Sequence, residues 1–176
     1  SARAAYESAL RIDQTLTQDA TGTLVMLELE AMELESLGPD KVRATLYNTI
    51  ASIVPNCLTI CIFPGWNRQD YAKMVQAAAG FDVSDYELLK VGERALTLAR
   101  VYNVREGFTA KDDVLCERSY TPTEAGALAE GGIDRDELCN AMQLYYGMAG
   151  WDENGRPTRA KLQELALGWV ADELAL

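Results

Sequence analysis

Apolar residues recur every three or four positions along most of this chain, the spacing that gathers them on one face of an α-helix. No segment alternates convincingly between apolar and polar residues with a period of two. The predicted helices cover residues 2–17, 22–37, 39–54, 67–79, 84–103, 134–148 and 158–174. The pattern therefore predicts an all-α fold, an irregular domain of about six to eight helices.

Several of the predicted helices begin at a residue that can cap them. Asn67 and Ser84 stand at N-cap positions, and Glu87 completes a capping box with Ser84. Asp134 and Thr158 occupy the same position before the last two helices. Side-chain oxygens at these positions satisfy backbone N–H groups that have no partner within the helix. These boundaries are therefore predicted from local chemistry.

Glycine and proline mark helix ends. Gly80 is the predicted C-cap of the helix at 67–79, and Pro55 stops the helix before it. The apolar run at 57–63 suits a strand or a tight helical turn, and we interpret it as a turn or short helix. Residues 104–134 are predicted to be a long loop-rich segment because of their glycines and proline.

Composition limits the classes of function. A length of 176 residues suits one helical domain over residues 1–176, or a piece of a larger protein. The net charge of −11 argues against nucleic acid and anionic membranes, which attract Lys and Arg. The sequence has no transmembrane stretch, no signal peptide and no initiator Met. Its four cysteines are few for this length, which indicates a reducing compartment and not a disulfide framework. We therefore expect a cytoplasmic protein and a fragment.

The chain contains no histidine, which removes the commonest general base and transition-metal ligand. Catalysis within the chain would have to use carboxylates, Cys, Tyr or Lys. The adjacent carboxylates Asp112 and Asp113 are the pair that a self-contained hydrolase could use. Loop capping is the simpler role for them, and no catalytic residue is assigned.

Cysteines are the other candidates for chemistry. Cys57 and Cys61 form a C-x3-C pair, unlike the C-x2-C pairs of zinc ribbons and common iron–sulfur sites. Spacing alone leaves a metal role and burial both open for this pair. Cys139 lies in an apolar helical stripe, and because free cysteine is among the most buried residue types, we predict that it is buried.

The segment at 92–118 combines charges of both signs with a glycine turn and an aromatic residue. Such a combination is not needed to end a helix. One interpretation is an ion-pair and capping network that ties a long helix to a loop, since the guanidinium of arginine suits paired carboxylates. The other is a direct role at a cofactor site. Sequence alone leaves both open.

Three blocks resemble the aldehyde ferredoxin oxidoreductase family, over about residues 40–168. One is a helix-to-loop signature, one is a closing motif, and one is the segment at 58–63, where the family has Asp-Ser-Leu-Gly-Leu-Cys followed by Phe. The first two blocks consist of Gly92, Glu93, Arg94, Arg100, Asn103, Arg105, Glu106, Gly107, Phe108, Thr109, Asp112, Asp113 and Leu115, and of Tyr145, Tyr146, Gly150, Trp151, Asp152, Gly155, Pro157, Thr158, Lys161, Leu162 and Leu165. Residues 1–38 form a helical portion outside the resemblance.

The resemblance implies a function. Members oxidise an aldehyde to a carboxylate at tungsten or molybdenum held by two pterin dithiolenes, and electrons leave through a 4Fe-4S cluster to ferredoxin. Cys61 takes the place of the last of the four cluster ligands. Asn56, Thr59 and Ile60 take the place of residues that line a pterin. The chain is thus expected to be the C-terminal domain of an electron-transfer oxidoreductase.

Three departures from the family fall beside Cys61. Asn56 replaces the aspartate, Cys57 the serine and Thr59 the glycine. Asn keeps hydrogen-bonding capacity but loses the charge. Thr adds a branched side chain where a backbone may need to come close to its neighbours, a place that suits glycine. We therefore expect a divergent member of the family.

The rest of such an enzyme is absent from this sequence. The β-rich N-terminal domain, and the middle region with three cluster cysteines and a catalytic glutamate, have no counterpart. One cysteine cannot hold a cluster that needs four ligands. We expect an inactive fragment without bound cofactor, whose partners are these missing domains. Their loss predicts an exposed apolar patch that supports a homodimer.

The alternative hypothesis is an acidic all-α protein-interaction module without a catalytic role. In that hypothesis the cysteines are simply buried core residues. The thiol of Cys61 separates the two, because an interface ligand lies exposed and a core cysteine does not react.

Overall fold

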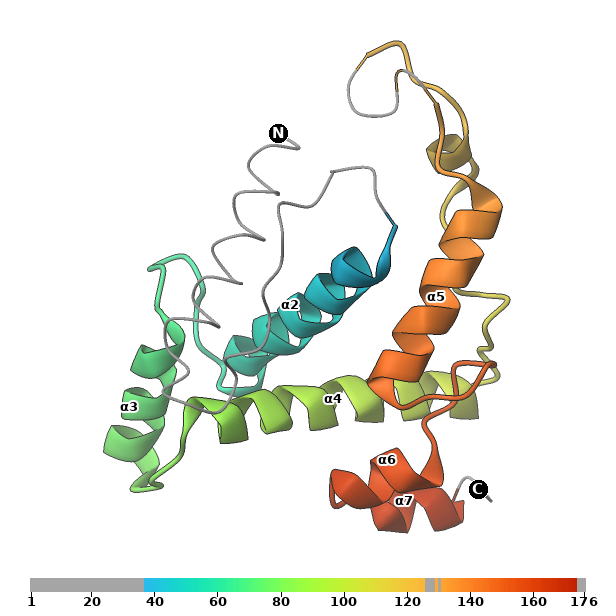
Figure 1. Ribbon diagram of the computed structural model, residues 1–176. Coiled ribbons are helices and arrows are strands. Elements are labelled where there is room, and N and C mark those ends of the chain that lie inside the picture. The colour runs from blue at the N-terminus through green and yellow to red at the C-terminus, as the bar shows by residue number, and fades with distance from the viewer. Residues whose placement is uncertain (1–36, 126–128, 130, 174–176) are drawn as a thin grey trace. The chain divides into compact units, whose positions relative to one another are not determined.

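The computed structural model describes residues 37–125, 129 and 131–173 (Figure 1). The helices predicted at 2–17 and 22–37 lie outside them, apart from Leu37. The described elements are α2 (Pro39–Cys57), α3 (Arg68–Ala79), α4 (Asp85–Arg105), the 3-10 helix η1 (Glu117–Tyr120), α5 (Arg135–Ala149), α6 (Arg159–Glu164) and α7 (Gly168–Glu173). Among the described residues β pairing is limited to a bridge between Trp151 and Pro157, so the all-α prediction is confirmed.

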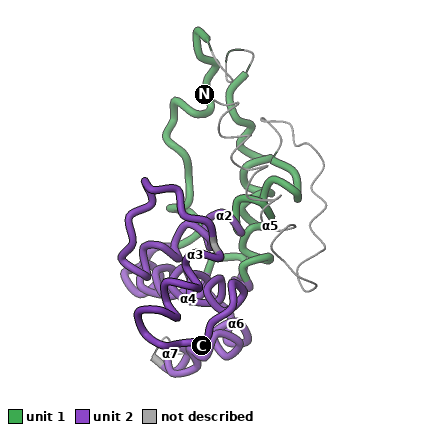
Figure 2. Tube along the Cα trace, turned by 90° about the vertical axis from the view of Figure 1, so that its left-hand side faces the viewer, with its two compact units in different colours: residues 1–46, 109–149, 153–155 green, residues 47–108, 150–152, 156–176 purple. Residues whose placement is uncertain are grey.

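The chain separates into two compact units, coloured in Figure 2. Unit 1 comprises residues 1–46, 109–149 and 153–155, and unit 2 comprises residues 47–108, 150–152 and 156–176. The predicted single domain over residues 1–176 stays a prediction, because one domain can hold more than one such unit. In the described part of the chain, no helix is both long and apolar enough to span a membrane.

The first core of unit 2 lies among α2, α3 and α4. Val54, Tyr71 and Leu88, one from each helix, are buried against one another. The capping predicted for α3 is confirmed: the Asn67 side chain accepts from the backbone N–H of Asp70, whose carboxylate accepts from the N–H of Asn67. These reciprocal bonds fix where the loop ends and the helix begins.

The remaining caps of these helices also follow the prediction. Gly80 ends α3 in the left-handed conformation, with φ of 73°, and its N–H donates to the Gln76 carbonyl. Ser84 and Glu87 form a capping box at the start of α4. Helix α4 continues to Arg105, two residues beyond the predicted end.

Helix α2 also runs further than predicted. It was expected to stop before Pro55 but continues to Cys57, with Pro55 inside its last turn. Proline removes one N–H donor, yet its fixed φ suits a helix and its carbonyl still accepts. Here the Pro55 carbonyl accepts from the N–H of Ile60. The bond that is lost is the one from residue 55 back to the Ala51 carbonyl, whereas the carbonyls of Val54, Pro55 and Asn56 all keep partners.

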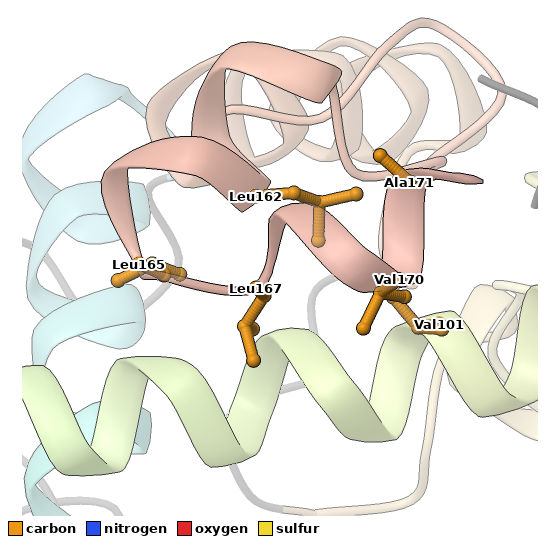
Figure 3. Close-up of a cluster of buried hydrophobic side chains, with 6 residues drawn as sticks. All are labelled: Val101, Leu162, Leu165, Leu167, Val170 and Ala171. Atoms are coloured by element: carbon orange, nitrogen blue, oxygen red, sulfur yellow. The ribbon is translucent and has the colours of Figure 1, made fainter. Parts of the chain in front are cut away.

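The second core of unit 2 lies where α6 and α7 meet α4, and Figure 3 shows its side chains between these helices. A single helix at 158–174 was predicted, and this is wrong: the helix breaks between Glu164 and Gly168. Ala166 takes a φ of 56° at the break. The break lets Leu165 and Leu167 join the same core, which a straight helix would prevent. The core consists of Val101, Leu162, Leu165, Leu167, Val170 and Ala171.

In unit 1, α5 buries Tyr146, Ala141 and Ala149 along one face. The predicted N-cap is confirmed, since the Asp134 carboxylate accepts from the backbone N–H groups of Asp136 and Glu137. Beyond the end of α4 at Arg105, the described part of the loop-rich segment 104–134 contains only the four-residue helix η1. That prediction is therefore confirmed for the described residues.

Candidate functional site

The segment with the predicted site residues closes helix α2. The Thr59 N–H donates to the Asn56 carbonyl at 3.2 Å, and the Ile60 N–H donates to the Pro55 carbonyl at 2.9 Å. Together with a left-handed residue at position 59, these two bonds form a Schellman motif. The segment is therefore a helix C-cap of fixed geometry.

Thr59 occupies the left-handed position of this cap, with φ of 54°. A β-branched residue is strained there, whereas glycine is not. The family that the sequence resembles has a glycine here, and the left-handed backbone of the cap explains why glycine suits this position. The motif as a whole was not recognised from sequence, because a threonine hides the glycine that usually signals it.

The cap divides the predicted site residues into two groups. Asn56, Thr59 and Cys61 are exposed, as is Cys57. Ile60 is half-buried and packs against the cluster of Val54, Tyr71 and Leu88, the hydrophobic contact that accompanies such caps. The backbone N–H groups of Thr59 and Ile60 are already used by the cap. Polar contact with a ligand would thus come from the side chains of Asn56 and Thr59.

Cys61 follows the cap directly and its thiol is exposed. Among the described residues there is no group of three or more His, Cys, Asp or Glu side chains able to hold a metal ion. A four-iron cluster needs four ligands, so the described residues do not fit one by themselves. What they offer is one thiol on a fixed turn.

The prediction for Cys139 is wrong, since this cysteine is exposed on α5. Its apolar neighbours in sequence do not all face a core. Cys116 is exposed as well, and a hydrogen bond with Ser119 lowers its thiol pKa, helped by the charge of Arg118. The four cysteines are therefore all on the surface.

In unit 2, ion pairs join the helix-to-loop block to the closing block. Glu93 on α4 accepts from Lys161 on α6 at 2.8 Å and from Lys90 at 2.7 Å. Glu164 accepts from the same two lysines, at 3.1 Å and 2.6 Å. These four residues form a closed ring of alternating charge, which we call the charge ring. It ties α6 to α4.

The charge ring changes the pKa of its members. Partial burial lowers the pKa of Lys90 and of Lys161, but hydrogen bonds with Glu93 and Glu164 outweigh burial and hold both values above the ordinary range. The hydrogen bond from Lys90 lowers the pKa of Glu164. All three shifts favour the charged forms. The sequence did not identify Lys90 and Glu164 as members of this network. Its only indication was that each stands three residues from a charged partner, Lys90 from Glu93 and Glu164 from Lys161.

Hydrogen bonds within the closing block also close a turn in unit 2. The N–H and the hydroxyl of Thr158 both donate to the Gly150 carbonyl, at 3.0 and 2.9 Å. Gly150 has a φ of 74°, and a side chain there would collide with Lys161. Trp151 lies under the guanidinium of Arg100, 5.2 Å from ring centroid to Cζ. These family-like residues therefore serve folding of the unit.

The two adjacent aspartates have structural contacts within unit 1. The Asp112 carboxylate accepts from the backbone N–H of Thr109 at 2.8 Å, which caps the turn. The Asp113 carboxylate accepts from the hydroxyl of Tyr146, a fully buried side chain. Loop capping is thus the observed role of Asp112. Of the two interpretations of segment 92–118, these contacts and the charge ring correspond to the ion-pair and capping network.

Comparisons with known proteins agree on one family. The family model described as aldehyde ferredoxin oxidoreductase, domains 2 and 3, matches residues 6–167. Tungsten-containing aldehyde ferredoxin oxidoreductases of Thermococcus kodakarensis and Pyrococcus horikoshii are 30% and 31% identical over 139 residues, which is 77% of this chain. The chain spans 23% of the length of these relatives.

Two more distant matches extend the comparison. The WOR-like subunit of an aliphatic sulfonate oxidoreductase from Pyrococcus furiosus is 27% identical over 124 residues, 65% of this chain and 20% of that protein. The active-site complex BamBC of benzoyl coenzyme A reductase superposes with a TM-score of 0.66 over 96% of this chain and 26% of that one. At 22% identity this likeness shows the fold alone.

Proposed function

Because the chain belongs to the aldehyde ferredoxin oxidoreductase family, matching its domains 2 and 3, we propose that it is part of an enzyme that oxidises an aldehyde to a carboxylate. The parent enzyme would carry a 4Fe-4S cluster and a tungsten or molybdenum bis-pterin, and would pass electrons to ferredoxin. When bound, the metal supplies the redox chemistry, and the protein supplies binding and orientation. The names of the tungsten-containing relatives support this proposal.

Within that enzyme, Cys61 is proposed to supply one of the four cluster thiolates. The observation that carries this role is an exposed thiol directly after the Schellman cap of α2. The cap holds the backbone before Cys61 in one geometry, and a ligand benefits from such a fixed base because ordering it on binding costs less. The other three thiolates would come from polypeptide outside this chain. We accordingly expect the chain alone to be inactive and free of cluster.

Asn56, Thr59 and Ile60 are proposed to form the pterin side of the same turn. The exposed amide of Asn56 can donate and accept hydrogen bonds, and the hydroxyl of Thr59 can accept. Ile60 would act through the cap, because its side chain packs inward. The neutral Asn56 amide keeps polar contact without adding a charge beside an electron-rich cofactor.

The ligand role is tested in the full-length enzyme with Cys61→Ala and Cys57→Ala. Cys57 is the matched control, being an exposed cysteine on the same turn. We expect Cys61→Ala to lose cluster iron and the electron paramagnetic resonance signal of a reduced four-iron cluster, and Cys57→Ala to keep both. Full iron content and an unchanged signal in Cys61→Ala would refute the assignment.

The pterin contact is tested with Asn56→Ala against Asn140→Ala. Both asparagines are exposed on a helix, Asn56 on α2 and Asn140 on α5, so both changes remove a polar side chain from a helix surface. After acid extraction, fluorescence of the oxidised pterin measures cofactor content per polypeptide. We expect a lower content in Asn56→Ala only. Equal content in the two variants would remove Asn56 from the site.

The alternative of an interaction module with buried cysteines is not supported. Its premise was that the four cysteines are core residues, and all four are exposed.

A further inference from the structure

A stretch that covers most of α2 and the loop after it lacks charged residues. Residues 44–67 contain no Asp, Glu, Lys or Arg, although charged residues make up 24% of the chain. The stretch includes most of α2, its cap and the loop to α3. Part of it is buried core, where absence of charge is expected. The exposed part is the informative one, because surfaces in water normally carry charge.

The exposed residues of this stretch are neutral on the helix and apolar on the loop. Asn48, Ser52 and Asn56 recur every fourth residue on α2, so they share one face, and all three are exposed. The loop beyond the cap then presents Ile62, Phe63 and Trp66, with 62%, 94% and 41% of their surface exposed. We call these six residues together the uncharged surface.

The loop of the uncharged surface is held at both ends. Before it, the Schellman cap fixes Thr59 and Ile60. After it, the capping box fixes Asn67 at the start of α3. Because the loop is fixed at both ends, its exposed apolar side chains lose little further conformational entropy when a partner covers them, which favours binding. Cys61, with its exposed thiol, lies in the same loop.

We propose that the uncharged surface is the docking surface for the remaining polypeptide of the parent enzyme, the part outside residues 1–176. This inference rests on the proposed function. The chain spans 23% of the length of its relatives, so most of the parent polypeptide lies elsewhere. The centres of protein interfaces are depleted of charge and enriched in aromatic residues, as this surface is. A Cys61 thiolate also needs partners from outside the described residues, and docking at this surface would bring them.

The occupant is therefore expected to present an apolar, uncharged face to Phe63. Hydroxyl-radical footprinting of the full-length enzyme tests this directly, because it reports solvent access to individual aromatic side chains. For Phe63 the modification rate in native enzyme is compared with the rate in urea. We expect at least about a tenfold lower rate in the native enzyme, as for a residue at an interface core. A native rate within about twofold of the unfolded rate would overturn the proposal.

A pair of variants gives a second, independent measurement. Phe63→Ser should lower the melting temperature of the full-length enzyme by at least about 3 °C. Phe81→Ser removes another exposed phenylalanine, 64% exposed, at the other end of α3 and should leave the melting temperature within about 1 °C. Equal effects of the two changes would count against docking at this surface.

The same preparations distinguish three further outcomes. If Phe63 loses its protection on dilution, as the enzyme dissociates into monomers, a second copy covers the surface and the proposal fails. If Phe63 is protected while Cys61→Ala keeps its iron, docking stands and the ligand role of Cys61 fails. If iron is lost in Cys61→Ala but Phe63 is unprotected, the ligand role stands and docking fails.

Discussion

Lys161 on α6 donates a hydrogen bond to Glu93 on α4 across 2.8 Å, although 68 positions separate them in the chain. Both side chains are largely shielded from solvent, 18% and 17% exposed. A pair in this setting differs from a surface ion pair, because removing one member leaves a charge with poor access to water. The pair is also part of the larger charge ring.

Glu93→Gln should therefore destabilise the protein by about 2 kcal/mol. The change keeps the side-chain size but leaves Lys90 and Lys161 with Glu164 as their remaining carboxylate. Urea unfolding at neutral pH measures the loss. Glu106→Gln is the control, since the pair of Glu106 with Arg105 is well exposed and should contribute less than about 0.5 kcal/mol. Equal losses for the two variants would show that the charge ring behaves as a surface network.

The pH dependence of stability should carry the signature of Glu164. Its pKa is lowered in the folded protein by the hydrogen bond from Lys90, from an ordinary value of 4.5. A lowered carboxyl pKa contributes stability above the unfolded value, and this contribution is lost as pH falls below 4.5 and through the folded value. Lys90 and Lys161 have raised values, so their contribution is complete below 10.5 and is lost as pH rises through the folded values.

The variant Glu164→Gln tests the loss of stability at low pH separately from the loss at high pH. Urea midpoints of wild type and variant should differ most near pH 7 and converge as pH falls below 4.5 and through the lowered pKa of the folded carboxyl. A difference that is constant over this range would mean that Glu164 acts through packing and not through its charge.

Two left-handed residues other than glycine are positions where stability can be gained. Thr59 and Ala166 have φ of 54° and 56°. Thr59→Gly and Ala166→Gly should each stabilise the protein by about 0.5–1 kcal/mol, since relief of strain exceeds the added freedom of glycine in the unfolded chain. Thermal unfolding measures the gain. The reverse change, Gly80→Ala, places a side chain at φ of 73° and should destabilise by a similar amount.

Gly92 allows α4 to approach α2 closely within unit 2. A Cβ at this position would lie 2.4 Å from the backbone carbonyl oxygen of Ile50, which cannot move as a side chain can. Gly92→Ala should destabilise by about 1–3 kcal/mol, as measured by urea unfolding. Gly147→Ala, in α5, meets nothing within 4 Å and should stabilise by about 0.5–1 kcal/mol through helix propensity. If the two changes have the same sign, the close approach does not limit packing.

Much of the fold could be predicted because its determinants are local. Asn67 and Ser84 predict the starts of α3 and α4, because each caps its helix through hydrogen bonds to a residue three positions later. The break before α7 could not be predicted in this way. Ala166 is an ordinary helix former, and its left-handed conformation is maintained by Leu165 and Leu167 entering a core that includes Val101 of α4. Burial against a distant helix overrides local propensity there.

The candidate site divides along the same line. A turn or short helix over residues 57–63 was predicted from nearby residues, but its Schellman geometry was not, because Thr59 stands where a glycine usually signals it. The charge ring was not, because Lys90 and Glu164 meet only after α4 and α6 have packed. Cys139 was predicted to be buried from the average behaviour of free cysteine, but its position on α5 faces outward. An average over cysteines says little about one helix face.

The Schellman cap after α2 has a consequence for how such a site can change over time. Its backbone hydrogen bonds are made within the chain, so the path of the turn does not depend on which side chains point outward. Serine can become cysteine at position 57, and aspartate can become asparagine at position 56, without rebuilding the turn. Even a threonine at the left-handed position 59 is compatible with this path. The turn is therefore a backbone frame whose outward side chains can be replaced one residue at a time.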